Sequence, residues 1–343
     1  MTTHVTDRPS AQPVGPPPPF DPELAPVVAS LATLFPPDAY RPDNIAEMRK
    51  PVPGAEKPTN EILSRGGAYS VEERTVPGPD GEPDISLLIC LPKHPATPTP
   101  AIYHVHGGGM IVEDNRFGMV EMLDLAEPMG MAVVSVEYRL APETPHPGPV
   151  EDCYAGLVWV SEHAHELNID PGRIVIGGMS AGGGLSAGVT LMARDRNGPA
   201  VLAQLLLSPM LDDRNDSPSA RQMRGVGIWD RSSNETGWNA LLGDGVRGGP
   251  DVSPYAAPFR AADLSGLPST FVDVGSAETF RDEDVAYASR MWQAGGSVEL
   301  HVWPGGFHGF DVVVPHAVLS QDAIAARLAW LRRQLGRTPP VRR

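Results

Sequence analysis

The chain has 343 residues, 41% of them hydrophobic, which is enough to form one large α/β domain or two modest ones with a sizeable core. Its 42 acidic and 27 basic side chains leave a formal net charge of -15, which would repel a phosphate backbone and argues against nucleic-acid binding. The one basic cluster, at 332–333 and 337–343, is typical of a solvated tail.

Cysteine content and hydropathy give an indication of the cellular compartment. Only Cys90 and Cys153 occur, each inside an apolar stretch, which indicates buried free thiols in a reducing compartment rather than a disulfide framework. No stretch of about 18 apolar residues is present, and the N-terminus lacks a charged segment followed by an apolar one. We therefore expect a cytoplasmic protein that does not associate with membranes.

The N-terminal part falls into two segments. Residues 1–20, "MTTHVTDRPSAQPVGPPPPF", are proline-rich without apolar periodicity and predict a flexible or draped arm. In residues 21–65 the stretch "DPELAPVVASLATLF" has apolar residues at helical spacing, which predicts one or two amphipathic helices ahead of the main domain.

From residue 66 onward, short β-branched apolar runs alternate with helical segments. Runs without strict polar alternation are typical of strands buried on both faces, so residues 66–210 and 259–337 predict an α/β fold with a mostly parallel central sheet. The predicted strands are "ISLLICL" (86–92), "AIYHV" (101–105), "MAVVSVEY" (131–138), "RIVIGG" (173–178), "AQLLLSPM" (203–210), "STFVDVG" (269–275) and "VELHVW" (298–303).

Residues 211–258 interrupt this alternation. The segment contains helical patches such as "SNETGWNALLG" but no predicted strand, and it is too long for an ordinary connection. Such insertions usually cover a site, so we interpret it as part of a cap.

A nucleophile candidate follows the strand "RIVIGG". Ser180 is the centre of a G-x-S-x-G motif, between Gly178-Met179 and Ala181-Gly182, at a predicted strand-to-helix turn. A serine on such a sharp turn has strained backbone, so small residues two positions away on each side prevent clashes, and the following helix N-terminus favours developing negative charge. No Lys-Ser/Thr follows, which argues against a phosphate loop. Residues 182–187 satisfy G-x-G-x-x-A, but inside the helix rather than in the turn, which argues against dinucleotide binding.

A glycine loop follows the strand at 101–105. Gly107, Gly108 and Gly109 come after His106, and backbone N–H groups can approach a substrate oxygen only where no side chain intervenes. We expect the N–H groups of Gly108, Gly109 and Ala181 to form an oxyanion hole. His104 and His106 could instead be an H-x-H metal pair, but no third ligand lies nearby, so we expect His106 to support the loop and no metal to bind.

The general base should follow the last strand. "PGGFHGF" places His308 on a glycine-flanked loop after "VELHVW". The other candidates are less well placed, because His301 lies within the strand, His316 lies beyond the loop, and residues 163 and 165 lie on a helix.

Five motifs in this order resemble those of the hormone-sensitive-lipase-like (bacterial family IV) esterases over residues 65–335. The resemblance implies an α/β-hydrolase fold, a helical cap made of the N-terminal helices and the 211–258 insertion, and hydrolysis of carboxylic esters without a cofactor. Met179 departs from the family, which usually has Asp or Thr there. The motifs are His106-Gly107-Gly108-Gly109, Tyr138-Arg139-Leu140-Ala141-Pro142-Glu143, Gly178-Met179-Ser180-Ala181-Gly182-Gly183, Ser253-Pro254-Tyr255 and Phe307-His308-Gly309-Phe310.

The acid of the triad belongs to "GSAETFRDED", residues 275–284, because the order serine, acid, histidine fits this fold. Glu278 stands in the register of the family's aspartate, directly after the strand. Asp282 is the alternative, on a helix face expected to turn toward the core, and Asp273 inside the strand is a third candidate. Residues 283 and 284 fall in the first helical turn, where acidic groups commonly complement the helix dipole.

These features predict a carboxylesterase acting on short-to-medium acyl esters through an acyl-enzyme. The alternatives are an amidase or arylformamidase with the same residues, and a non-catalytic small-molecule-binding member of the fold. We expect a small ester as the partner, no metal or cofactor, and a candidate homodimer surface on the apolar C-terminal segment "AIAARLAWL". The candidate pocket residues are Met179, Met210, Trp229, Trp238 and Phe280.

Overall fold

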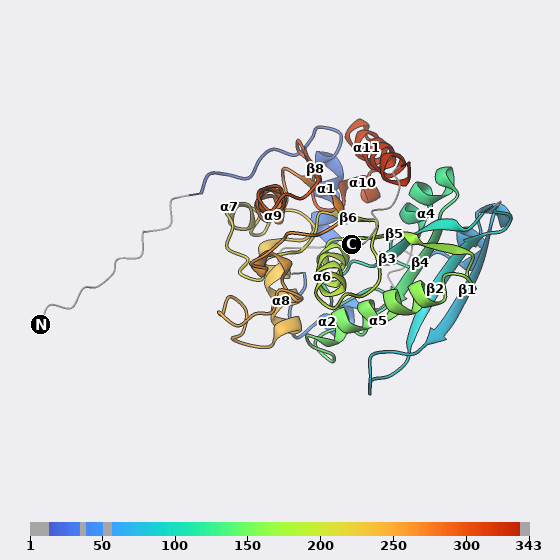
Figure 1. Ribbon diagram of the computed structural model, residues 1–343. Helices are drawn as coiled ribbons and strands as arrows, with labels where there is room; N and C mark the ends of the chain where they lie inside the picture. Colours follow the sequence, from blue (N-terminus) through green and yellow to red (C-terminus); the bar gives the residue numbers. More distant parts are fainter. Residues whose placement is uncertain (1–13, 35–38, 51–56, 96, 337–343) are drawn as a thin grey trace, which may run out of the picture.

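The computed structural model describes residues 14–34, 39–50, 57–95 and 97–336 (Figure 1). The expected arm lies outside these residues up to position 13, and so does the arginine-rich end at 337–343. Residues 14–20 of the arm run along the protein surface, where the Gln222 side chain donates to the carbonyl oxygen of Pro16 at 2.9 Å.

The described part of the chain contains one eight-stranded sheet with the order β1-β2-β4-β3-β5-β6-β7-β8. Strand β2 is antiparallel to both β1 and β4, and all pairs from β4 to β8 are parallel. The prediction of a mostly parallel sheet is therefore confirmed. The strands are β1 (Tyr69–Val76), β2 (Ile85–Pro92), β3 (Thr99–Val105), β4 (Ala132–Glu137), β5 (Ile169–Met179), β6 (Ala203–Leu207), β7 (Ser269–Gly275) and β8 (Val298–Trp303).

All seven strands predicted from the sequence are present, but β1 was missed. Strand β1, "YSVEERTV", lies at the edge of the sheet, and its middle residues are exposed or half-buried. Its sequence therefore lacks the apolar run by which the other strands were identified. Strand β6 ends at Leu207, before the Ser-Pro-Met that the sequence assigned to it.

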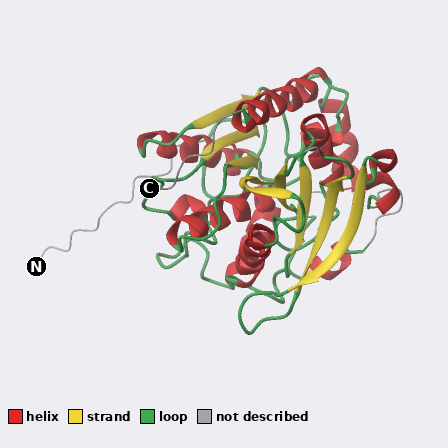
Figure 2. Ribbon diagram, turned by 45° about the vertical axis from the view of Figure 1, so that its right-hand side comes forward, coloured by secondary structure: helices red, strands yellow, loops and turns green. Residues whose placement is uncertain are grey.

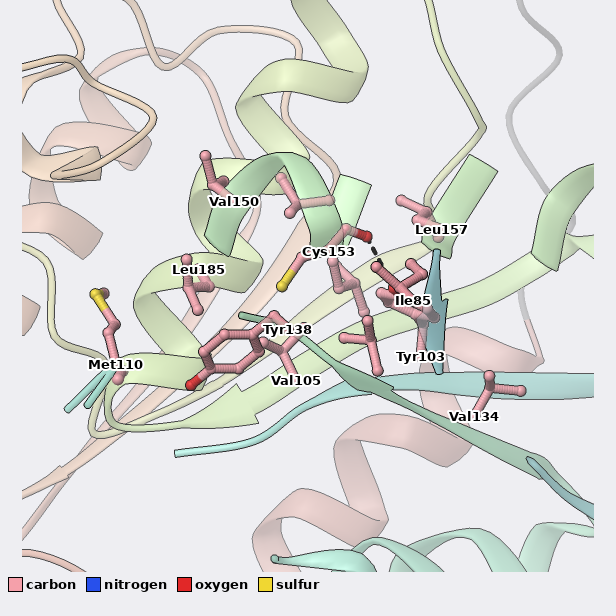
Figure 3. Close-up of a cluster of buried hydrophobic side chains, with 14 of the residues drawn as sticks. Ile85, Tyr103, Val105, Met110, Val134, Tyr138, Val150, Cys153, Leu157 and Leu185 are labelled. Carbon is pink, nitrogen blue, oxygen red and sulfur yellow. Dashed lines mark hydrogen bonds between the residues drawn. The ribbon is translucent and has the colours of Figure 1, made fainter. Parts of the chain in front are cut away.

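Helices cover both faces of the sheet, as Figure 2 shows (helices red, strands yellow). On one face, α5 and α6 pack on alternate residues of the central strands, such as Tyr103 and Ile176. Figure 3 shows this cluster, in which the Tyr103 hydroxyl donates to the Cys153 carbonyl oxygen at 2.8 Å. On the other face, α4 and α11 pack on the intervening residues, such as Ile102 and Val175. This two-sided burial explains why the parallel strands are continuous apolar runs.

The helices vary from one turn to five. Within the described residues they are α1 (Ala25–Leu34), α2 (Ile45–Met48), α3 (Asn60–Leu63), α4 (Met119–Ala126), α5 (Gly148–Glu162), α6 (Ala181–Asp195), α7 (Pro218–Gln222), α8 (Arg231–Leu242), α9 (Arg281–Gln293), α10 (Phe310–Val313) and α11 (Val318–Leu335), with 3₁₀ turns at Arg65–Gly67, Glu127–Met129 and Pro258–Arg260. None of them combines the length and the apolar character that a bilayer-crossing helix needs.

The 211–258 insertion contributes α7 and α8, which lie on the opposite side of the molecule from β1 and β2 in Figure 1. Asp230 caps α8 by accepting from the Ser233 N–H at 2.8 Å. The insertion contacts the N-terminal segment, because the Tyr40 and Trp229 rings lie 5.0 Å apart and Thr236 donates to the Tyr40 carbonyl oxygen at 2.9 Å. The division into a catalytic domain and a cap stays a prediction.

The N-terminal segment also packs beside the loop that carries His308. The Phe20 and Phe307 rings meet edge to face at 6.4 Å, and the Asp21 N–H donates to the Gly305 carbonyl oxygen at 3.0 Å. Gly305 has a φ of 79°, and a Cβ there would lie 2.3 Å from the Asp21 nitrogen. This position therefore needs glycine for both its conformation and its contact.

The C-terminal segment "AIAARLAWL" does not present an exposed apolar face, contrary to our expectation. Its largest apolar side chains, Trp330 and Leu331, are buried against the sheet, with the Trp330 ring 5.5 Å from that of Phe271. Apolar residues of this helix therefore belong to the core, and the reason given for a homodimer surface there is removed.

A buried ion cluster joins α11 to the end of the sheet. The Arg327 guanidinium is nearly inaccessible and contacts two carboxylates, those of Asp273 on β7, at 2.8 Å, and Asp311 on α10. Trp303 also donates to Asp273 at 3.2 Å. Asp273, one of three acid candidates from the sequence, therefore has a structural partner.

Replacing Arg327 by Leu should destabilise the protein by about 3–5 kcal/mol, because it leaves two buried carboxylates without a counter-charge. Urea denaturation of both proteins measures the difference. Arg333→Ala is the control on the same helix, since its pair with Glu299 is exposed and should contribute less than about 1 kcal/mol. Equal stability of all three proteins would contradict the prediction.

Candidate active site

Ser180 lies on the sharp turn between β5 and α6. Its φ of 61° and ψ of -125° lie outside the regions that side-chain-bearing residues usually adopt. Hydrogen bonds to the segment after β6 hold this conformation, because the Ser180 N–H donates to the Leu207 carbonyl oxygen at 2.8 Å and the Ser180 carbonyl accepts from the Met210 N–H at 2.9 Å.

The glycines of the G-x-S-x-G motif allow this turn to pack on β3. A Cβ on Gly178 would lie 2.2 Å from the Val105 carbonyl oxygen, and one on Gly182 would lie 2.0 Å from the same atom. Neither contact is sterically possible, so both positions require glycine. Residues 182–187, which formally match a dinucleotide motif, lie within α6. In this stretch a Cβ on Gly184 would lie 2.1 Å from the Met210 carbonyl oxygen, so the glycine allows close packing of the helix.

The glycine loop after β3 lies directly beside this turn. A Cβ on Gly107 would be 3.1 Å from the Met179 carbonyl oxygen and 3.7 Å from the Ser180 Cβ. Gly108 and Gly109 both have positive φ, 101° and 61°. The loop therefore passes close to Ser180 in a conformation that favours glycine.

His106 supports this loop from within. Its ring stacks on Tyr138 at 4.0 Å, its Nδ1 lies 2.8 Å from the Gly107 carbonyl oxygen, and Tyr138 donates to the His106 carbonyl oxygen at 3.1 Å. Burial lowers the pKa of His106 to about 3, so the ring is neutral. His104 instead approaches the Phe117 carbonyl oxygen at 2.9 Å, and the described residues contain no cluster of three side chains suited to a metal.

The structure brings His308 and Glu278 together. The His308 Nδ1 lies 3.2 Å from the Glu278 Oε1, and the Phe280 ring meets the imidazole edge to face at 5.2 Å. The base loop also approaches the serine turn, since a Cβ on Gly309 would lie 4.0 Å from the Met179 Cε. Glu278 itself is buried, and its other oxygen, Oε2, accepts from Ser208 at 2.9 Å and from the Gly275 N–H at 3.1 Å.

Asp282 has other partners. Its Oδ2 accepts from the Ser219 N–H at 2.7 Å, and its Oδ1 accepts from Arg281 at 2.7 Å. The carboxylate thus joins the start of α9 to α7. Of the two acids between which the sequence could not decide, Glu278 is the one placed at the imidazole.

Glu283 and Asp284, the next two acidic residues, are buried. The sequence predicted instead an ordinary first helical turn in which acidic groups complement the helix dipole. Glu283 Oε1 accepts from the Leu211 and Asp212 N–H groups at 2.8 and 3.1 Å. Asp284 is fully buried and neither of its oxygens has a hydrogen-bond partner in the described structure. Burial raises the pKa of both carboxyls well above their usual range, with the neighbouring carboxyls adding to the effect.

Ser208 is the residue at this site that sequence reasoning missed. It directly follows β6, and the sequence assigned it to the strand itself. The usable signal was its place at the carboxyl end of a parallel strand, where functional side chains of α/β folds gather.

The five pocket candidates differ in their position. Trp229 lies against the glycine loop, because a Cβ on Gly109 would be 2.2 Å from its ring. Met210, Trp238 and Phe280 are fully buried, while Met179 is half-buried. Trp229 thus adjoins the glycine loop, while Met179 precedes Ser180 in the turn and Met210 is bonded to the Ser180 backbone.

Several known proteins are similar to this chain over most of its length. Residues 102–312 match the model of a family described by its α/β hydrolase fold. The chain is 35% identical over 331 residues to carboxylesterase NlhH of Mycobacterium tuberculosis, which covers 92% of this chain and 97% of that protein. Among solved structures it resembles a bacterial heroin esterase, with a TM-score of 0.82, 39% identity and coverage of 93% and 98%. It also resembles esterase LipW from Mycobacterium marinum, with a TM-score of 0.77, 31% identity and coverage of 93% and 96%.

A further carboxyl with a raised pKa, that of Glu137 at the end of β4, gives a pH prediction. Glu137 accepts from the Asn115 N–H at 2.7 Å, and burial raises its pKa to about 7. Between pH 4.5 and 7 the unfolded chain therefore loses this proton before the folded protein does, so stability falls as pH rises through this window.

Glu137→Gln keeps an acceptor for Asn115 and removes this titration. Urea denaturation at pH 4.5 and pH 8 should show the variant gaining stability relative to wild type at the higher pH. As a control of opposite sign, Glu143→Gln removes a carboxyl whose pKa Arg49 lowers. If the Glu137→Gln and wild-type stabilities run parallel across this range, the raised pKa is wrong.

Proposed function

The chain belongs to the hormone-sensitive-lipase-like esterases of the α/β-hydrolase fold and hydrolyses carboxylic esters, and on this premise we propose that Ser180, His308 and Glu278 form its catalytic triad. The observation that carries the assignment is the 3.2 Å approach of His308 Nδ1 to the buried Glu278 carboxylate. It is supported by the strained turn at Ser180 and by the approach of the His308 loop to that turn.

In the proposed mechanism the Ser180 Oγ attacks the ester carbonyl carbon while His308 Nε2 takes the hydroxyl proton. The tetrahedral intermediate collapses, His308 returns the proton to the leaving alcohol, and an acyl-Ser180 remains. Water then attacks the acyl carbon with His308 again as base, which releases the acid and regenerates the serine. Glu278 accepts the Nδ1 hydrogen, which fixes the tautomer and stabilises the imidazolium.

The oxyanion of both intermediates would be bound by the N–H groups of Gly108, Gly109 and Ala181. Ala181 begins α6, so its N–H has no acceptor within the helix and adds to the positive end of the helix dipole. Each such donor is worth about 3 kcal/mol of transition-state stabilisation. His106 and Tyr138 would keep the loop in place without touching the substrate.

The acyl pocket would be bounded by the contact between the N-terminal segment and the insertion. Trp229 packs on Gly109, and the Tyr40 ring lies on Trp229 at 5.0 Å. Thr279, next to the triad acid, donates to the Trp229 carbonyl oxygen at 2.7 Å, so this wall is tied to the catalytic loop. A bulky rigid wall close to the oxyanion hole favours short-to-medium acyl groups.

We also propose that the protein works in a reducing compartment such as the cytoplasm. Cys90 on β2 and Cys153 on α5 are both buried free thiols. This arrangement is typical of proteins that are not stabilised by disulfides.

Ser180→Ala should abolish hydrolysis of a short-chain aryl ester, and Glu278→Gln should lower kcat/KM about 10⁴-fold because the imidazole loses its orientation. Asp282→Asn is the matched control, since an amide oxygen can still accept from Ser219. Steady-state kinetics of the four proteins measure the effect. A large loss in Asp282→Asn with little loss in Glu278→Gln would assign the acid to Asp282.

Trp229→Ala should shift the acyl preference toward longer chains, because removing the ring opens space next to Gly109. The ratio of kcat/KM for an octanoate to that for an acetate aryl ester should rise about 10-fold or more, within the range that pocket size controls. Trp292→Ala on the exposed side of α9 should leave the ratio unchanged. An unchanged ratio in Trp229→Ala would place the acyl group elsewhere.

A further inference from the structure

We propose that Ser208 is a positioning residue that holds the Glu278 carboxylate in one orientation for His308. The inference rests on the proposed triad and adds a fourth side chain to it. Ser208 Oγ donates to Glu278 Oε2 at 2.9 Å, while Oε1 faces the imidazole at 3.2 Å. The two carboxylate oxygens therefore have different partners: Oε1 contacts the imidazole, and Oε2 accepts from the segment after β6.

The backbone of Ser208 continues the hydrogen bonding of the sheet just past the end of β6. Its φ of 43° lies in the left-handed region, and its N–H donates to the Asp273 carbonyl oxygen at 2.7 Å. On either side of it, the Leu207 carbonyl and the Met210 N–H hold the backbone of Ser180. The same four-residue segment thus fixes the nucleophile by main-chain bonds and the acid by the Ser208 hydroxyl.

A glutamate needs such a partner more than an aspartate does. Its additional rotatable bond must be immobilised before Oε1 can lie at a fixed distance from the imidazole. Ser208 and the Gly275 N–H are the donors to Oε2 in the described structure. Gly275 ends β7, whereas Ser208 follows the neighbouring strand β6. The two bonds thus fix the carboxylate from two directions.

Glu278 lies in an acidic cluster. Glu283 and Asp284, both buried on α9, interact electrostatically with Glu278, and Asp273 on β7 interacts with Asp284. Arg327 is paired with Asp273 and Asp311, and Arg281 is paired with Asp282. The Ser208 hydroxyl and the Gly275 N–H are therefore the donors that hold the Glu278 carboxylate among these acidic side chains.

The test is the pH dependence of kcat/KM for a short-chain aryl ester in Ser208→Ala and Ser208→Gly. Both variants remove the hydroxyl, and glycine also suits the positive φ, so a folding defect from the backbone is avoided in one of them. We expect about a 10-fold or greater loss in kcat with little change in KM, as for a hydrogen bond to a charged group. Ser135→Ala is the control, a buried serine on β4 whose hydroxyl has no partner in the described structure.

The acid limb of the profile should also move to higher pH in both variants. Without the Ser208 donor the carboxylate has one hydrogen bond fewer to stabilise its negative charge, so it interacts more strongly with the imidazolium form of His308. A purely structural defect would lower activity equally at all pH values. In an enzyme already carrying Glu278→Ala, Ser208→Ala should have no further effect, because no carboxylate remains to be held.

Activity and pH profiles of both Ser208 variants that match Ser135→Ala would overturn the proposal while leaving the triad intact. An equal loss in the Glu278→Ala background would also overturn it, since Ser208 would then act independently of the acid. Wild-type activity in Ser180→Ala would instead overturn the proposed function, and this inference with it.

Discussion

The site depends on the pairing of β5 with β6, and in particular on the bonds that continue this pairing past the strand ends. The Ser180 N–H donates to the Leu207 carbonyl and the Met210 N–H donates to the Ser180 carbonyl, so the turn at Ser180 is formed as an extension of the sheet. Backbone strain at φ 61° persists only where the surroundings determine it, and here two main-chain bonds and two obligatory glycines do so. A shift in register between these two strands would displace Ser180 and Ser208 together.

The fold was largely predictable because parallel strands buried on both faces are visible as apolar runs. The glycines at 107–109, 178 and 182 were also predictable, since glycine is needed where backbone approaches backbone this closely. His308 was found by its position on a glycine-flanked loop after the last strand. Strand β1 was missed because an exposed edge strand has no such run. Ser208 was missed because its role depends on a partner 70 positions away, which no local pattern records.

Charge burial was the least predictable part of the molecule. Glu283 and Asp284 have the sequence signature of an ordinary helix N-terminus, yet both are buried, and the register of α9 against the insertion decides this. Asp273 carries the same charge, but Arg327 neutralises it. Three acidic residues within a dozen positions thus have three different environments, and each environment is set by an element distant in sequence.

The contact of Phe20 and Asp21 with the His308 loop has a consequence for biosynthesis. A ribosome makes the chain from its N-terminus, so the partner of residue 20 emerges nearly 290 residues later, after the strands β1 to β8 have left the exit tunnel in order. The Ser180 turn packs on β3 and is hydrogen-bonded to the end of β6, whereas the His308 loop packs against Phe20 and Asp21. A nascent chain would therefore form the Ser180 turn before the His308 loop could pack against Phe20 and Asp21.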